Sequence, residues 1–197
     1  YYKEYEDGAI QKRCYYDHGE LDGEFTGYYP SGAIMTRCTY VSDSIPGRFQ
    51  RFFDSKEKGV AGTVSEEGGY SNFKKSGVWN LYYPSGELYT TGEYSDGKFS
   101  GKWLVYYENG NLKQEGHYKN GLAEGEFRLY YETGELKSKG KYRDDQKTGK
   151  WIAYYESGDV MTIIEFSKGE RDGKAVGFDK TGKQVEEHYY NNEKNID

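Results

Sequence analysis

The side chains that could do chemistry are few and scattered. The three histidines, His18, His117 and His188, lie far apart in the sequence. Catalysis requires unlike groups that converge on one place. Neither a Cys/His cluster with zinc-ligand spacing nor an oxygen-rich calcium loop occurs. We therefore expect a protein that is not an enzyme and that has no metal site and no cofactor.

Two other groups of residues invite a chemical interpretation. The acidic pairs Asp144-Asp145 and Glu66-Glu67 are expected in connectors, where they would be solvated loop charge. The glycine-rich pieces Gly59-Val-Ala-Gly62 and Gly68-Gly69 lack the strand-glycine-lysine-helix context of a phosphate-binding loop. We expect both pieces to be flexible insertion.

The chain that positions these residues is a tandem array. One repeat starts at Gly101 and the next at Gly125, a period of 24 residues. Turn glycines keep this period once a six-residue insertion is allowed for: Gly8, Gly32, Gly86, Gly110, Gly134, Gly158 and Gly182. We predict a single array over residues 1–197 with about eight repeats. An irregular insertion is expected near residues 54–76, with its turn at Gly59; it is either tolerated drift or a contact specific to a partner.

Each repeat has the pattern of a β-hairpin. Residues alternate in character from Lys102 to Tyr107, which indicates a strand, and a short turn follows at Gly110. A second strand is predicted from about Asn111 to Tyr118. Helix-like spacing is scarce and only three prolines are present. The predicted fold class is all-β, an antiparallel meander of hairpins.

One face of the hairpins is apolar and is predicted to be buried. Its members are Trp79, Trp103, Phe127 and Trp151, then Leu81, Val105, Leu129 and Ala153, then Leu88, Leu112, Leu136 and Val160, then Tyr94, Tyr118, Tyr142 and Phe166. Glycines at positions 92, 116 and 140 would let a large ring lie close to the backbone. Cys14 and Cys38 occupy the same repeat position, about 10 Å apart if two strands separate them, so we expect free thiols.

The opposite face carries an aromatic ladder. Its members are Tyr28, Phe52, Tyr82, Tyr106, Tyr130 and Tyr154. Stacked aromatics on neighbouring strands stabilise a sheet by themselves. A row of exposed tyrosines is also typical of a protein interface or a sugar-binding groove. The sequence leaves both interpretations open and makes these six residues the candidate interaction face.

Composition limits the partners. The net charge is −6 and basic residues form no stripe, so a nucleic acid partner is not expected. The acidity serves solubility or attracts a basic partner. No apolar run is long enough to span a bilayer and no signal peptide is visible. Because the chain begins at Tyr1, we expect that a preceding segment was removed; the cell envelope, secretion and the cytoplasm all remain open.

The motif carries a family resemblance. Gly-x-Trp-x-x-Tyr-Tyr-x-x-Gly-x-Leu, followed by Gly-x-Tyr-x-x-Gly, resembles the MORN repeat, in the variant form of bacterial YwqK-type, antitoxin-like proteins. The resemblance covers about residues 5–190. It implies an elongated, twisted antiparallel sheet made of successive hairpins, and a role in protein association or membrane-proximal scaffolding instead of catalysis.

Two functions follow as hypotheses. The first is a protein-binding scaffold, such as an antitoxin or immunity protein, that uses the aromatic ladder. The second is a surface module that binds cell-wall glycan or lipid headgroups, since its composition is similar to that of choline-binding repeats. Exposed strands at the ends of an array would also allow an edge-paired homodimer.

Overall fold

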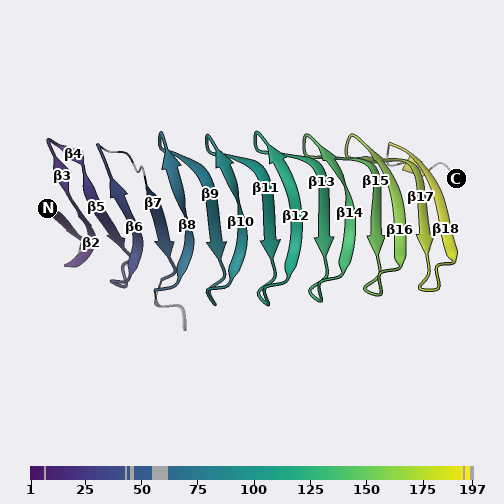
Figure 1. Cartoon of the computed structure of the whole chain (residues 1–197), viewed down its shortest axis with the longest axis horizontal. Coiled ribbons are helices and arrows are strands. Elements are labelled where there is room, and N and C mark those ends of the chain that lie inside the picture. Colours follow the sequence, from purple (N-terminus) through teal and green to yellow (C-terminus); the bar gives the residue numbers. More distant parts are fainter. Residues whose placement is uncertain (7, 43, 45–46, 55–61, 193, 196–197) are drawn as a thin grey trace. The chain divides into compact units, whose positions relative to one another are not determined.

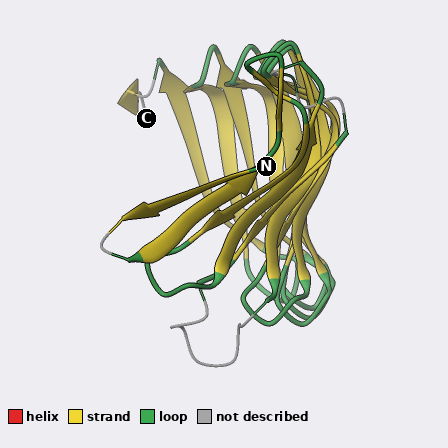
Figure 2. Ribbon diagram, turned by 90° about the vertical axis from the view of Figure 1, so that its left-hand side faces the viewer, coloured by secondary structure: helices red, strands yellow, loops and turns green. Residues whose placement is uncertain are grey.

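The computed structural model describes residues 1–197 except 7, 43, 45–46, 55–61, 193 and 196–197 (Figure 1). Contacts divide the chain into two compact units, Tyr1–Lys98 and Phe99–Asp197. Every regular element in the described residues is a β-strand, and the turns gather at the two ends of the strands (Figure 2). No described helix could cross a membrane. The all-β prediction is confirmed.

The first unit is a meander in which each long strand pairs with the next in antiparallel register. Strands β3 and β4 form a separate short hairpin beside it. The strands are β1 (Tyr2–Glu6), β2 (Ala9–Cys14), β3 (Tyr16–Asp17), β4 (Glu20–Leu21), β5 (Gly23–Tyr28), β6 (Ile34–Tyr40), β7 (Arg48–Phe52), β8 (Val64–Ser71), β9 (Lys74–Tyr82) and β10 (Leu88–Ser95).

The second unit repeats the same antiparallel pairing from strand to strand. Its strands are β11 (Lys98–Tyr106), β12 (Leu112–Lys119), β13 (Leu122–Tyr130), β14 (Leu136–Arg143), β15 (Gln146–Tyr154), β16 (Val160–Ser167), β17 (Glu170–Phe178), β18 (Gln184–Asn191) and β19 (Lys194–Asn195). The β-hairpin repeat is therefore the building block of both units.

Two kinds of turn alternate along the chain. In the wider turn, the Tyr107 amide donates to the Asn111 carbonyl at 2.8 Å and Gly110 takes a φ of 85°. The tighter turn has two central residues, Asn120 (φ 54°) and Gly121 (φ 90°), the signature of a type I′ hairpin. Because the tight turns are so short, the strands that follow them begin early: β11 begins at Lys98, four residues before the predicted start at Lys102.

The predicted apolar face is the core of each unit, and we call it the ring face. Its large rings are buried: Trp79 (0% exposed), Trp103 (7%), Phe127 (2%) and Trp151 (8%). Neighbouring rings meet edge to face, with centroids 4.8 Å apart for Phe127 and Tyr142 and 5.1 Å apart for Tyr142 and Trp151. Rings therefore supply the packing that short aliphatic side chains supply in most cores.

Glycines on the ring face make room for these rings, as predicted for Gly116 and Gly140. A Cβ atom added to Gly140 would lie 2.2 Å from the Trp151 ring, and one added to Gly116 would lie 2.2 Å from the Phe127 ring. Gly68 lies in the same way under Trp79, whose indole N–H donates to the Gly69 carbonyl at 3.0 Å. The prediction that Gly68-Gly69 is flexible insertion is therefore wrong, since both belong to β8. Residues 59–61 lie outside the described residues.

The prediction for one set of aliphatic residues is also wrong. Gln114 lies opposite Val105, and Leu112 lies opposite Tyr106. Lys113, between them on β12, has no residue opposite it and forms a bulge. The bulge reverses the alternation of side chains, so Leu112 joins Tyr106 on the face away from Trp103. The same register shift moves the other members of the set: Leu88, Leu136 and Val160 lie opposite Tyr82, Tyr130 and Tyr154.

In several repeats, the second tyrosine of the aromatic pair forms a hydrogen bond to the next hairpin. The Tyr107 hydroxyl donates to the Tyr130 carbonyl at 2.8 Å, and Tyr131 and Tyr155 do the same to Tyr154 and Phe178. At the next equivalent position stands Asp179. Its carboxylate instead accepts the Thr181 and Lys183 amides within its own turn.

Cys14 and Cys38 are buried free thiols, as predicted. Burial raises the pKa of the Cys38 thiol to about 11. A thiol that stays protonated at neutral pH is a poor nucleophile. Cys38 is therefore a small packing residue of the core, and Cys14 is buried at the equivalent repeat position.

Candidate interaction face

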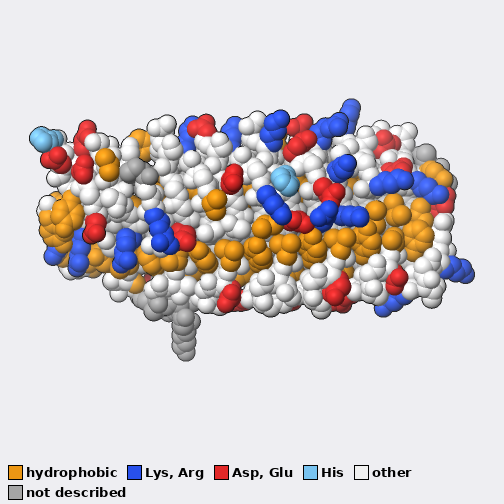
Figure 3. Space-filling view, viewed as in Figure 1, with side chains coloured by type: hydrophobic (Ala, Val, Ile, Leu, Met, Phe, Trp, Pro, Cys, Tyr) orange, Lys and Arg blue, Asp and Glu red, His pale blue; other side chains and the backbone are white. Residues whose placement is uncertain are grey.

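The six predicted ladder residues each lie opposite an aliphatic residue of the next strand. We call the face that carries these pairs the ladder face. The pairs are Tyr28 with Ile34, Phe52 with Val64 and Tyr82 with Leu88 in the first unit, and Tyr106 with Leu112, Tyr130 with Leu136 and Tyr154 with Val160 in the second. Within each unit they form an apolar row with charged side chains beside it (Figure 3). Phe52 is buried and the other five aromatics are half-buried.

Most ladder rings are held by a residue of the preceding strand. The Tyr82 and Tyr130 hydroxyls donate to Glu67 and Glu115, each at 2.7 Å. At the equivalent positions, cationic groups lie over the rings: Arg13 over Tyr28, Arg37 over Phe52 and Lys139 over Tyr154, at 5.4 to 5.9 Å from the ring centroids. The ladder rings thus contribute to the sheet and still expose part of their surface.

Glu115 is the most strongly perturbed carboxylate of the ladder face. It accepts the Tyr130 hydroxyl and lies 2.9 Å from the Lys102 ammonium and 3.3 Å from the Arg128 guanidinium. These partners lower the pKa of Glu115 from 4.5 to about 2, against the desolvation that would raise it. The residue is fully ionised at neutral pH and its charge is compensated within the protein.

The prediction that Glu66-Glu67 is solvated loop charge is wrong, because both residues belong to β8 and are only 17% and 15% exposed in their side chains. Glu66 pairs with Lys75 at 2.8 Å on the ring face. Glu67 accepts hydrogen bonds from Arg48, Gln50 and Tyr82. Desolvation would raise the pKa of Glu67, but these hydrogen bonds lower it overall.

Asp144 and Asp145 do lie in a connector, as predicted, and form the two central residues of a tight turn with φ values of 50° and 64°. Asp145 has a structural role besides. Its carboxylate accepts the Ala123 amide at 2.5 Å, which links this turn to the strand one repeat earlier.

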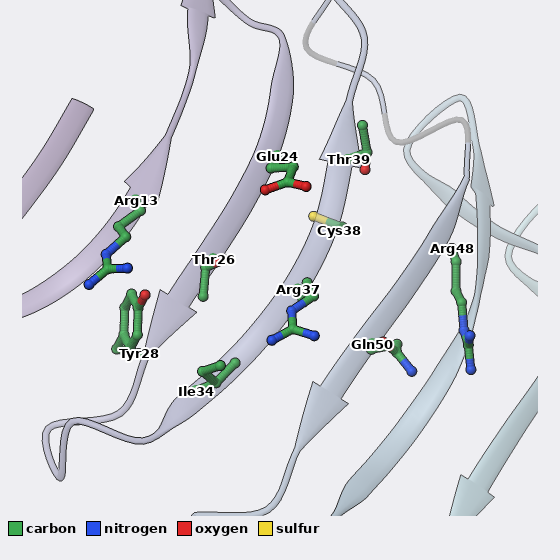
Figure 4. Close-up of a pocket in the computed structure, with 10 residues that line it drawn as sticks. All are labelled: Arg13, Glu24, Thr26, Tyr28, Ile34, Arg37, Cys38, Thr39, Arg48 and Gln50. Carbon is green, nitrogen blue, oxygen red and sulfur yellow. The ribbon is translucent and has the colours of Figure 1, made fainter. Parts of the chain in front are cut away.

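A second row of side chains crosses the ladder face beside the apolar row, and we call it the middle row. In the first unit it reads Arg13, Thr26, Arg37, Gln50, Glu67, Asn80 and Thr91, each opposite the next. Its first three members line an open hollow of about 480 Å³ together with Tyr28 and Ile34 (Figure 4).

The middle row of the second unit has a different chemistry. It reads Leu104, Glu115, Arg128, Lys139, Ile152, Ile163, Val176 and Glu187. The half-buried Ile152, Ile163 and Val176 extend the apolar surface of the ladder face there. Sequence reasoning missed both middle rows, because only the cross-strand register brings these residues into line.

Among the described residues, no three His, Cys, Asp or Glu side chains are grouped so as to hold a metal ion. What the ladder face offers is apolar contact area, bordered by ion pairs and by arginines.

The comparisons with known proteins agree with this hairpin structure. A family model described as MORN repeat variant matches residues 21–42, 75–96, 99–120, 123–144 and 147–168, more than half of the chain. Each matched segment corresponds to one wide-turn hairpin, such as β11 with β12. A search of curated proteins finds no match to the chain.

Proposed function

Since the chain belongs to the MORN repeat variant family, whose repeats are protein- or lipid-binding modules, we propose that it is a non-catalytic scaffold that binds another protein through the ladder face. The finer proposal is that this partner is neutralised by binding, as in an antitoxin or immunity protein. Binding through an extended face would engage several hairpins at once.

One observation carries the proposal. In each unit, pairs of aromatic and aliphatic side chains stand along a row that stays partly exposed except at Phe52, while Trp79, Trp103, Phe127 and Trp151 of the ring face are buried. Rows that combine aromatic surface with arginine and bordering ion pairs are typical of protein interfaces. Large single-ligand pockets would instead be expected of a small-molecule site.

The bulges of β12 and β14 permit a test with a matched control. A photo-cross-linking amino acid is placed at Leu112 or Leu136 on the ladder face. In the control it is placed two residues along the same strands, at Gln114 or Ser138, which the bulges place on the ring face. After irradiation in the native host, we expect cross-links to one protein from Leu112 and Leu136 and from neither control position.

Equal cross-linking from the two faces would contradict the proposal. So would cross-links to lipid alone, or retention by anionic vesicles or cell-wall glycan with no protein adduct, which would favour the surface-module alternative. Thermal unfolding of all four variants checks that each remains folded.

A further inference from the structure

The hollow of the first unit contains hydrogen-bond donors that have no acceptor among the described residues. Arg13 lies opposite Thr26, which lies opposite Arg37, so the three side chains share the ladder face. Within the described part of the chain, neither arginine pairs with a carboxylate; each lies over a ladder ring instead. The Tyr28 and Thr26 hydroxyls likewise make no hydrogen bond to a described residue. Two arginines therefore share one hollow in a chain whose net charge is −6, and neither is paired with a described carboxylate.

At two other places on the ladder face, similar donors surround a carboxylate of the protein itself. At Glu67, a carboxylate sits between the Tyr82 hydroxyl, Arg48 and the Gln50 amide. At Glu115, a carboxylate sits between the Tyr130 hydroxyl and the cationic Lys102 and Arg128. In both places the ladder tyrosine and neighbouring cations surround one carboxylate.

Arg13 and Arg37 occupy the repeat positions that Glu67 and Glu115 fill elsewhere. The hollow beside Tyr28 thus has the tyrosine hydroxyl of those sites but has cations where they have a carboxylate, and Glu24 stands at the repeat position of Arg48 and Lys102. Arg13 and Arg37 lie two strands apart, about 10 Å between Cα atoms, with the short Thr26 between them. The side chains that line this space come from β2, β5 and β6, and Arg13 lies beside Tyr28 (Figure 4).

Glu24 limits where an anion can sit. It lies two residues before Thr26 on β5 and forms the edge of the hollow opposite Tyr28 and Ile34. Its charge repels an anion from that edge and directs it toward the Tyr28 hydroxyl. Arg48 also lines the hollow, but Glu67 already compensates its charge.

We propose that this hollow binds the carboxylate of an aspartate or glutamate side chain of the partner protein, held by Arg13, Arg37 and the Tyr28 hydroxyl. That the carboxylate belongs to a partner protein rests on the scaffold function proposed above. The guanidinium groups supply charge-assisted hydrogen bonds, the strongest kind available to a protein surface. Since Tyr28 and Ile34 form the edge of the hollow opposite Glu24, an apolar neighbour of the acidic residue would be favoured.

The test observes the arginine side chains directly. The ¹⁵N-labelled protein is titrated with the peptide acetyl-Gly-Glu-Gly-Glu-Gly-amide, and the Nε–Hε signals of the arginines are followed by NMR. We expect saturable shifts for Arg13 and Arg37 and none for Arg128, which is already paired with Glu115. The glutamine counterpart of the peptide should leave all signals in place.

The double variant R13Q/R37Q should weaken binding of the glutamate peptide by about tenfold or more. The control double variant Lys119→Gln with Arg143→Gln removes the same two charges from exposed positions outside the hollow and should bind as the parent does. The protein is also titrated with inorganic phosphate, to distinguish a carboxylate ligand from a phosphorylated one.

No shift with the glutamate peptide, or unchanged binding by R13Q/R37Q, would overturn the proposal. Saturable shifts with phosphate alone would overturn it in favour of a phosphorylated ligand. The scaffold function is tested separately by the cross-links from Leu112 and Leu136. If these cross-links persist in R13Q/R37Q, the scaffold function is supported, but the hollow is not part of the interface with the partner. Binding of the glutamate peptide without any cross-link to a protein would overturn only the inference that the carboxylate belongs to a partner protein.

Discussion

The Tyr131 hydroxyl donates a 2.7 Å hydrogen bond to the main-chain carbonyl of Tyr154, which stands 23 residues later in the next hairpin. The bond lies at the wide-turn end of the strands, where the ladder of one repeat meets the turn of another. It connects neighbouring hairpins in addition to the strand pairing. In this repeat and its neighbours, the two residues of the aromatic pair thus have different roles: the first lies on the ladder face and the second joins repeats.

Tyr131→Phe should therefore destabilise the second unit by about 1 kcal/mol, because the Tyr154 carbonyl loses a partly buried donor. Tyr154→Phe is the matched control, since its hydroxyl has no described partner and its removal should cost little. Chemical denaturation of the two variants measures the difference. Equal losses would show that the hydroxyl bond does not stabilise the array.

Gly140→Ala should be among the most destabilising single changes, at about 2–4 kcal/mol. The added Cβ would lie 2.2 Å from the Trp151 ring, so ring and strand must separate. Gly134→Ala provides the comparison. It meets no atom within 4 Å and suffers only from a φ of 105°, a cost of about 1 kcal/mol. A reversed order in thermal unfolding would contradict this account of the ring face.

Phe73→Gly should stabilise the first unit by about 0.5–1 kcal/mol. Phe73 occupies a turn position with a φ of 60° and is 72% exposed, so its ring gains little from packing while its backbone is strained. Phe73→Ala keeps the Cβ atom and should bring no such gain. If Phe73→Gly instead lowers the midpoint of thermal unfolding, the exposed ring has contacts that stabilise the turn.

Acid should weaken the second unit through Glu115. The pKa of this carboxyl falls from 4.5 to about 2 on folding, so its ionised form stabilises the fold above about pH 4.5. That contribution is lost as the pH decreases from 4.5 toward 2 and amounts to about 1–2 kcal/mol after a discount for solvent screening. Glu115→Gln should flatten the dependence of unfolding free energy on pH in this window. An unchanged slope would show that Glu115 is not coupled to folding.

The sequence predicts the regular parts of this fold well because they obey period-two alternation and a fixed repeat length. Trp151 and Gly140 are found in this way, and so is the close approach of a large ring to the glycine. The alternation rule fails at Lys113, where one extra residue in β12 sends Leu112 to the other face. Nothing in the local residue types distinguishes a bulge from a continuous strand, so the true partners of the ladder could not be predicted.

The polar part of the candidate face was less predictable for a different reason. Glu67 looks like solvated charge until the register places Arg48, Gln50 and Tyr82 around it. The pairing of Arg13 with Arg37 across Thr26 likewise depends on two strand registers. Such sites arise between strands, whereas a sequence pattern describes one strand at a time.

The bond from Tyr131 to Tyr154 also bears on how such a gene can lengthen. A duplication of one whole 24-residue segment creates a hydroxyl donor together with a carbonyl acceptor, so the copy fits wherever it is inserted in phase. A copy placed beyond β18 instead follows the repeat of Asp179, which bonds within its own turn and offers no hydroxyl. New repeats are therefore accommodated more readily in the interior of the array than beyond that turn.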